Sequence, residues 1–433
     1  SKNNNSQKNN KNNEKFTVKN KNKNSEPVVD VGFPSTLTSV PIVHRSNHKD
    51  IVFENLPSLP SSNNIMNDPR NTITMNLVEK KIGICSVLCD FSDPSADIRA
   101  KSTKTHTLSE LDVIFSNVAL VQRLPPQIVD SYFEMLMKNI MRDLPPIKKE
   151  YLIFDDEPAL VDINWPHLQI IYKQFLNFQQ LHPNKITNSV VSKLLTRIHA
   201  PDAEEREQVL CFFRYYVLAN PAKTTTIFKK FSYILQDYIN RNCYPFAVTP
   251  ILKFYSIQFP LQCKDGQLLI TIFSTSILPL LSCQHIISYY GVLLQIIQFF
   301  IAVDPTITPQ IIRRVLLYWP QSNPNKQILF ISLISFLMEN LSRSEFEKMS
   351  KRIFRLLSDY ASSSNAKVAE ASLLIWSNIK IIPKILDNTR AIFPITFPQF
   401  TKTAHDHWNP ETQTLASNTL KSMHDLDPFL YDE

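Results

Sequence analysis

Glycine is scarce in this sequence. Only Gly32, Gly83, Gly266 and Gly291 occur among 433 residues, whereas glycine makes up about 7% of an ordinary chain. Phosphate-cradling loops, nucleophile elbows and tight hairpins need glycine where the backbone angle φ is positive or where a ligand approaches the main chain. None of the motifs built on such loops can be written with these four glycines. The shortage argues against nucleotide-binding and hydrolase folds and favours an all-helical chain.

The residues that usually form catalytic and metal sites show no ordered pattern. The six cysteines include no C-x-x-C pair, and the ten histidines include no H-E-x-x-H motif. Cys85 and Cys89 are one helical turn apart among apolar residues, which is typical of buried thiols. We therefore expect no catalytic residues, no metal, no cofactor and no enzyme activity. Scattered thiols favour a reducing compartment, so we expect a cytoplasmic protein and leave a nuclear location open.

A basic body is also missing. The formal net charge is +7, but residues 1–24 hold seven lysines and one acid, which leaves 39 basic and 38 acidic residues in the rest of the chain. Nucleic-acid-binding chains carry a basic face, so we expect no nucleic-acid partner. The most apolar stretch, residues 286–301, contains Ser288, Gln295 and Gln298. A bilayer span takes about 20 apolar residues, so we predict that this stretch is too short and expect no membrane partner.

Composition divides the chain into three parts. Residues 1–26 are a low-complexity Lys/Asn tail that we predict to be disordered. Residues 27–73 carry six prolines among serines and asparagines and predict an extended linker. In residues 74–433, apolar residues recur at helical spacing and the predicted helices pair with a period of about 40 residues, as in HEAT and armadillo repeats. The fold class predicted is all-α, a curved α-solenoid of HEAT/armadillo-like helix pairs.

An acidic segment precedes one of the predicted helices. Asp155, Asp156 and Glu157 are followed by Pro158, and Pro166 then starts the helix, a position that suits its fixed φ and missing N–H. One interpretation is a solvated turn that caps the helix. The other is a negative contact surface held on a rigid helix entry.

A second group combines cations with aromatic rings on two consecutive predicted helices. Such a surface can bind a peptide that carries apolar anchors and an acid or a phosphate. The alternative is an ordinary helix face with solvated lysines and core tyrosines. The group consists of Arg214, Tyr215, Tyr216, Lys223, Lys229 and Lys230.

The four tryptophans lie at the edges of predicted helices. A large ring there fills space between repeats, and its N–H is expected to find a carbonyl. We therefore predict a structural role for Trp165, Trp319, Trp376 and Trp408.

Several stretches resemble one known family. The string D-D-E-P-A-L-V-D-I-N-W-P-H-L-Q at residues 155–169 is similar to the E-D-E-P-T-L-E-x-x-W-P-H-L-Q of the B-prime (fifty-six-kilodalton) regulatory subunits of protein phosphatase 2A. Five shorter stretches match the family in the same order, at residues 85–94, 317–320, 368–378, 392–398 and 407–409. Together they cover the chain from about residue 80 to its end.

The resemblance implies a non-catalytic subunit that binds a scaffold subunit and a catalytic phosphatase subunit and directs substrate selection. It implies that the acidic segment, Asp155 to Pro158, faces these partners. It also implies a groove that reads short Leu-x-x-Ile-x-Glu motifs, where the family has H-R-I-Y-G-K-F. Here Arg214 and Tyr216 agree with that pattern, but Phe213 and Leu218 replace the histidine and the lysine.

Other readings stay open from the sequence. A shift of the alignment by one residue would place Arg214 on the family's histidine, so the groove has either changed its specificity or been lost. A stand-alone helical-repeat adaptor or transport receptor is the alternative function. An RNA-binding helical repeat is disfavoured by the near-neutral body.

Overall fold

The computed structural model describes residues 56–93, 95–241, 244–262 and 265–432. Within these ranges the chain is all-α: it forms twenty α-helices with short 3₁₀ and π turns, no strand, and one isolated β-bridge between Leu160 and Asp202. The predicted disordered tail and most of the predicted linker lie outside the described residues. The all-helical prediction is confirmed.

Helices begin earlier than the predicted boundary at residue 74. α2 (Ser62–Asn67) and the first residues of α3 lie inside the segment that composition predicts to be an extended linker. The polar residues that suggested a linker are helix caps here. The Ser61 side chain accepts a hydrogen bond from the backbone N–H of Asn64, and the Asn71 side chain accepts from the N–H groups of Ile73 and Thr74.

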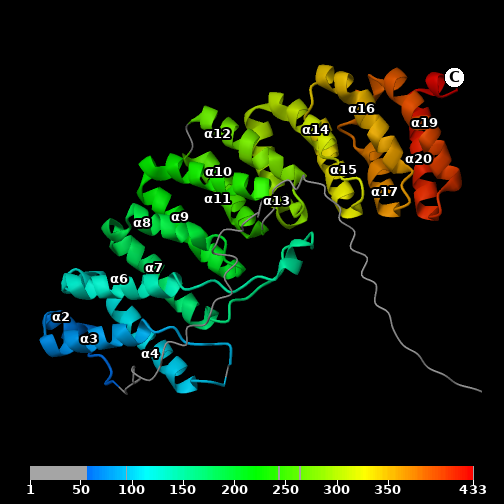
Figure 1. Ribbon diagram of the computed structural model, residues 1–433. Coiled ribbons are helices and arrows are strands. Elements are labelled where there is room, and N and C mark those ends of the chain that lie inside the picture. The colour runs from blue at the N-terminus through cyan, green and yellow to red at the C-terminus, as the bar shows by residue number, and fades with distance from the viewer. Residues whose placement is uncertain (1–55, 94, 242–243, 263–264, 433) are drawn as a thin grey trace, which may run out of the picture.

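The helices form two layers of a curved solenoid (Figure 1). The outer layer contains α3 (Thr72–Cys85), α6 (Pro126–Ile140), α8 (Asn188–Arg197), α10 (Thr224–Arg241), α12 (Gly266–Ile272), α14 (Thr308–Leu317), α16 (Arg343–Ala361) and α19 (Thr389–Asp406). The inner layer contains α4 (Ile98–Phe115), α7 (Trp165–Leu181), α9 (Ala203–Ala219), α11 (Val248–Gln262), α13 (Ile286–Val303), α15 (Pro324–Glu339), α17 (Ala366–Leu374) and α20 (Pro410–Leu426). The short helices are α5 (Val118–Val121), α18 (Ile382–Leu386) and α21 (Pro428–Asp432).

Packing follows the helical periodicity of the sequence. In α16, for example, Phe346, Met349, Ile353, Phe354 and Leu357 are buried at helical spacing. In the inner layer α7 packs on α9, α9 on α11, α11 on α13 and α13 on α15. One hydrophobic cluster therefore runs continuously through the described part of the solenoid.

The most apolar helix is α13. By length and composition alone it could cross a membrane, so the prediction that this stretch is too short to do so is wrong. It reaches 18 residues with a mean hydropathy of 2.0. Its apolarity has a structural reason, since α13 packs between α11 and α15 and also contacts the turn before α14. An inner-layer helix with neighbours on both sides needs apolar side chains around much of its circumference.

The tryptophans are only partly as predicted. Trp319 and Trp376 are buried between repeats, but neither indole N–H has a hydrogen-bond partner within the described residues. Trp408 is 68% exposed, so it does not fill space between repeats. Its indole N–H does donate to a carbonyl, that of Ser364 at 2.8 Å.

Candidate functional site

The acidic segment belongs to a long excursion between α6 and α7, which we call the strut (residues 143–161). It contains one 3₁₀ turn, Lys149–Leu152. In Figure 1 the strut leaves the arc at α6, extends along its inner side and returns to α7. On the way it contacts the N-terminal ends of α9, α13 and α15. It also contacts Tyr244, which precedes the 3₁₀ turn Pro245–Ala247 at the start of α11.

The two ends of the strut are joined by a buried ion cluster, which we call the base. The Arg142 guanidinium makes a bidentate pair with Glu205, at 2.9 and 2.8 Å, and also binds Asp162. Tyr172 donates to Glu205 at 2.8 Å. Burial alone would lower the pKa of Arg142, but the hydrogen bond and charge of Glu205, together with Asp162, raise it above its ordinary value.

The middle of the strut is held to α9 and α13. The Glu157 carboxylate pairs with Arg206, which also donates to the carbonyl oxygens of Ala200 and Pro201. The backbone N–H of Glu157 donates to the Ser288 hydroxyl at 2.8 Å. Burial raises the pKa of Glu157 and lowers that of Arg206, and the attraction between the two charges offsets this only in part.

The tip of the strut reaches α15. Lys326 donates to one oxygen of Asp155 at 2.8 Å, and the Asn323 amide donates to the other at 2.6 Å. The Gln284 amide donates to the backbone oxygen of Ile153 at 3.0 Å. A cavity of about 410 Å³ lies beside these contacts, and Gln284 and Lys326 form part of its wall.

Electrostatics explains why the strut is acidic. The N-terminal end of a helix carries partial positive charge, and a nearby carboxylate gains about 0.3–1 kcal/mol there. Asp155 lies at the N-terminus of α15, and Glu157 pairs with the fourth residue of α9. These two acids bind their own chain, so the solvated-turn interpretation is wrong for them.

The tip of the strut also carries side chains that are exposed to solvent. Asp156 is exposed and has no hydrogen bond or ion pair to any described residue. Ile153 is 74% exposed and Phe154 is 55% exposed. Pro158, the last predicted contact residue, is half-buried. At its tip the strut exposes one acid, Asp156, beside the apolar side chains of Ile153 and Phe154. Elsewhere along the strut the exposed residues include Asp143, Glu150 and Val161.

The predicted peptide groove is divided between the two layers. Arg214 and Tyr215 lie on the accessible side of α9, but Tyr216 is buried and stacks on Phe212. Glu207 accepts from Arg214 and from Lys253 of α11, each at 3.4 Å. Arg214 and Lys253 therefore share one site on the inner layer.

The three lysines of the predicted group lie elsewhere. Lys229 and Lys230 belong to α10 of the outer layer, where Lys230 donates to Ser192 of α8 at 3.2 Å. Lys223 lies in the turn between α9 and α10 and is exposed. Lys229 and Lys230 are separated from Arg214 because consecutive helices of a solenoid belong to opposite layers, and Lys223 lies beyond the C-terminal end of α9.

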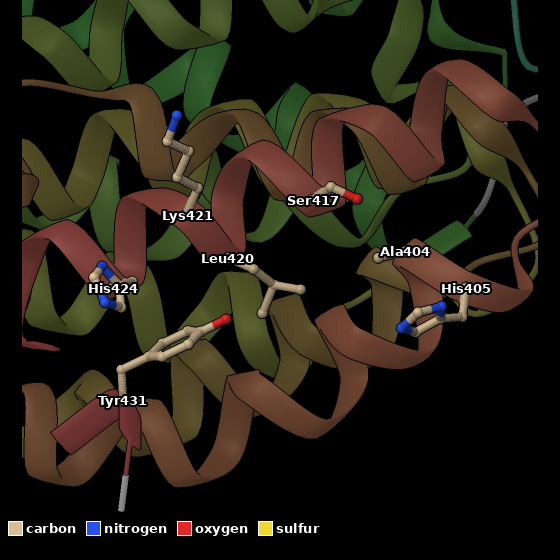
Figure 2. A pocket seen from close by; sticks show the side chains of 7 residues that line it. All are labelled: Ala404, His405, Ser417, Leu420, Lys421, His424 and Tyr431. Atoms are coloured by element: carbon tan, nitrogen blue, oxygen red, sulfur yellow. The ribbon is translucent and has the colours of Figure 1, made fainter. Parts of the chain in front are cut away.

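A second cavity lies at the C-terminal end of the arc, and none of the predicted site residues line it. It measures about 400 Å³ and lies between α19, α20 and α21. Figure 2 shows His405 and Tyr431 facing one another across Leu420, with Lys421 pointing away. Within the described residues no three histidine, cysteine or acidic side chains are grouped as metal ligands.

A sequence model of the protein phosphatase 2A regulatory B subunit (B56 family) matches residues 63–433. This chain belongs to that family. The resemblance seen in the motifs is thereby confirmed, and the match includes every helix from α3 to α20 and the whole strut.

Relatives agree over most of the chain. It is 29% identical to the B' eta isoform of the 59 kDa regulatory subunit of serine/threonine protein phosphatase 2A from Arabidopsis thaliana, over 88% of this chain and 76% of the relative. It is 26% identical to the alpha isoform of the human 56 kDa regulatory subunit, over 85% of this chain and 77% of the relative. The family comprises regulatory subunits of a phosphatase, so the expectation that this B56-family chain is not itself an enzyme is confirmed.

Sequence reasoning missed the residues that hold the strut. Arg142, Glu205, Arg206 and Lys326 have no local motif, and their partners are 20 to 171 positions away in the sequence. One signal was available. Asp202, Glu205 and Arg206 open a helix with charges at positions that the 3.6-residue period places on its buried side, and buried charges require partners.

Proposed function

We propose that this B56-family chain binds the scaffold subunit and the catalytic subunit of protein phosphatase 2A, and that it selects substrates without taking part in the chemistry. The observation that carries this proposal is the strut. It presents Asp156, Ile153 and Phe154 on the inner side of the arc while internal ion pairs fix its position. A rigid loop whose tip carries an unpaired acid beside two apolar side chains suits a protein partner with complementary charge.

The mechanism is recruitment. A substrate that is tethered to the arc gains effective concentration at the active site of a bound catalytic subunit. Hydrolysis and its metal ions belong to that catalytic subunit. This chain supplies position, and the curved inner layer supplies the surface on which partner and substrate are brought together.

Substrates would bind on the inner layer between α9 and α11. Arg214 and Lys253 provide cations there, and Tyr215, Leu218 and Ile257 are exposed apolar side chains on the same helices. This combination suits a short motif with apolar anchors and an acid, such as Leu-x-x-Ile-x-Glu. Lys223, Lys229 and Lys230 take no part.

The groove can be tested with a fluorescent Leu-x-x-Ile-x-Glu peptide. Combined Arg214→Ala and Lys253→Ala changes remove both cations and are expected to weaken binding by at least about tenfold, since one hydrogen bond to a charged group contributes about 1.5–3 kcal/mol. Lys229→Ala, on the outer layer, is the matched control and leaves binding unchanged. Equal loss in both variants, or no binding by the unaltered chain, contradicts the groove.

The holoenzyme proposal is tested by affinity purification of the tagged full chain from its own cells, followed by mass spectrometry and a phosphatase assay. Near-equal recovery of a scaffold and a catalytic phosphatase subunit is the expected result. Recovery with other partners and without phosphatase would favour the stand-alone adaptor. We further propose a cytoplasmic location, with a nuclear fraction left to be measured by fractionation of the same cells.

A further inference from the structure

Repeat solenoids normally hold their shape through contacts between neighbours only. The strut is an exception in this chain. Its longest contacts join Glu157 to Ser288, 131 positions away, and Asp155 to Lys326, 171 positions away. It starts beside α7 and ends on α15, and on the way it binds α9 and α13, which are not neighbours of one another in the inner layer.

The tip contacts are built into the start of α15. The Asn323 side chain caps this helix by accepting from the N–H of Lys326, and its amide donates to Asp155. Lys326 and Asp155 have side chains that are 15% and 35% exposed. An ion pair with this exposure is accessible to a competing charge, whereas the base pairs are sealed.

We propose that the strut is a brace that fixes the curvature of the solenoid, and that release of Asp155 from Lys326 and Asn323 lets the arc open between α13 and α15. The base keeps the strut attached to α6 and α7 in both states. The proposal concerns the shape of the free chain, so it holds whether or not the assigned partners are correct.

Such a brace would couple binding to shape. A partner that grips Ile153, Phe154 and Asp156 pulls on the same loop that holds α15. By linkage, whatever binds the open arc more tightly also weakens the tip contacts, and the reverse is equally true.

The test compares the unaltered full chain with four variants, the fourth being Lys326→Met. Asp155→Asn removes the charge but keeps the shape. Asp155→Lys combined with Lys326→Asp restores an ion pair with reversed charges. Asp156→Asn, one residue away and without an internal partner, is the matched control. Small-angle scattering measures the overall dimension, and amide exchange measures protection in residues 153–157 and at the start of α15.

Asp155→Asn is expected to increase the maximum dimension and to accelerate exchange at the tip by up to about fivefold, because the bonds to a partly exposed charged group become weaker bonds to a neutral one. The reversed pair restores the ion pair but not the hydrogen bond from Asn323, so it is expected to recover part of both values, and Asp156→Asn to change neither. Lys326→Met removes the other member of the ion pair and should likewise increase the maximum dimension and the exchange rate at the tip. Faster exchange with an unchanged dimension would overturn the brace, as would a reversed pair that brings no recovery of the dimension.

Discussion

The base and the tip of the strut use the same chemistry in different surroundings. At the base, Arg142 pairs with Asp162 and Glu205, whose side chains are 1% and 0% exposed. At the tip, Lys326 pairs with Asp155, which is 35% exposed. The side chains of the middle pair, Arg206 and Glu157, are 6% and 16% exposed, which is between the values at the base and at the tip. Burial therefore rises steadily from tip to base along one loop.

This gradient separates two roles for an ion pair. A charge that is sealed from water cannot lose its partner without a large cost, so the base behaves as part of the core. A pair that water can reach contributes little to stability and can exchange partners. The strut is thus permanently attached at one end and releasable at the other.

The largest effect is expected at the base. Arg142→Met leaves two buried carboxylates without a cation and should lower the free energy of unfolding by about 3–5 kcal/mol. Urea denaturation measures it. Adding Asp162→Asn and Glu205→Gln to the same variant removes the unpaired charges and should recover most of the loss. A loss under about 1 kcal/mol for Arg142→Met would show that the base is not sealed.

Acid should lower the stability of the packing between α4 and α7, next to the base. His167, near the start of α7, hydrogen-bonds to the carbonyl oxygen of Lys101, and burial together with the Lys104 charge lowers its pKa to about 4. The folded chain thus favours neutral His167, and this stability is complete above pH about 6.5 and is lost as the pH falls toward 4. The maximum loss is about 3 kcal/mol.

The check for this pH dependence is denaturation at several pH values. His167→Gln should flatten the profile between pH 6.5 and 4, and His405→Gln, at an exposed position, should leave it as it was. His199, whose pKa burial also lowers to about 4, should account for part of the remaining slope. An unaltered profile in the His167 variant would assign the acid sensitivity to other groups.

The middle pair should give an intermediate result. Burial works against the charges of both Glu157 and Arg206, so their pairing has less net value than its geometry suggests. Glu157→Gln is expected to lower the free energy of unfolding by about 1–2 kcal/mol. If Glu157→Gln lowers the free energy of unfolding more than Arg142→Met does, burial does not determine the order of the stability losses along the strut.

The smallest effect on global stability is expected at the tip. Asp155→Asn removes a partly exposed pair and should change the free energy of unfolding by no more than about 1 kcal/mol, although local exchange increases. Thermal and urea unfolding of this variant beside Asp156→Asn make the comparison. If Asp155→Asn lowers the free energy of unfolding as much as Arg142→Met does, the tip is not the weaker attachment of the strut.

Much of this architecture could be predicted from the sequence. Apolar spacing identified the helices and the repeat period, and the motifs identified the family. The layer of each helix was not assigned, so Arg214 and Lys229 were grouped although they lie on α9 and α10. Consecutive helices alternate between the two layers, and that rule alone would have separated these two residues.

The strut could not be predicted in the same way. An acidic loop looks equally like a solvated turn or a contact surface until its partners are known, and Lys326 is 171 residues from Asp155. Trp408 was missed for a related reason. Burial depends on which repeat follows, and a residue close to the end of the arc has few neighbours beyond it.

The central claim is that the strut presents Asp156 to a phosphatase partner while Asp155 and Glu157 bind their own chain. The most direct measurement is reconstitution of the chain with the scaffold and catalytic subunits of protein phosphatase 2A, followed on a size-exclusion column. The account predicts a stable three-part complex with the unaltered chain and a weaker one with Asp156→Lys. Absence of the complex, or an Asp156→Lys chain that assembles equally well, would contradict it.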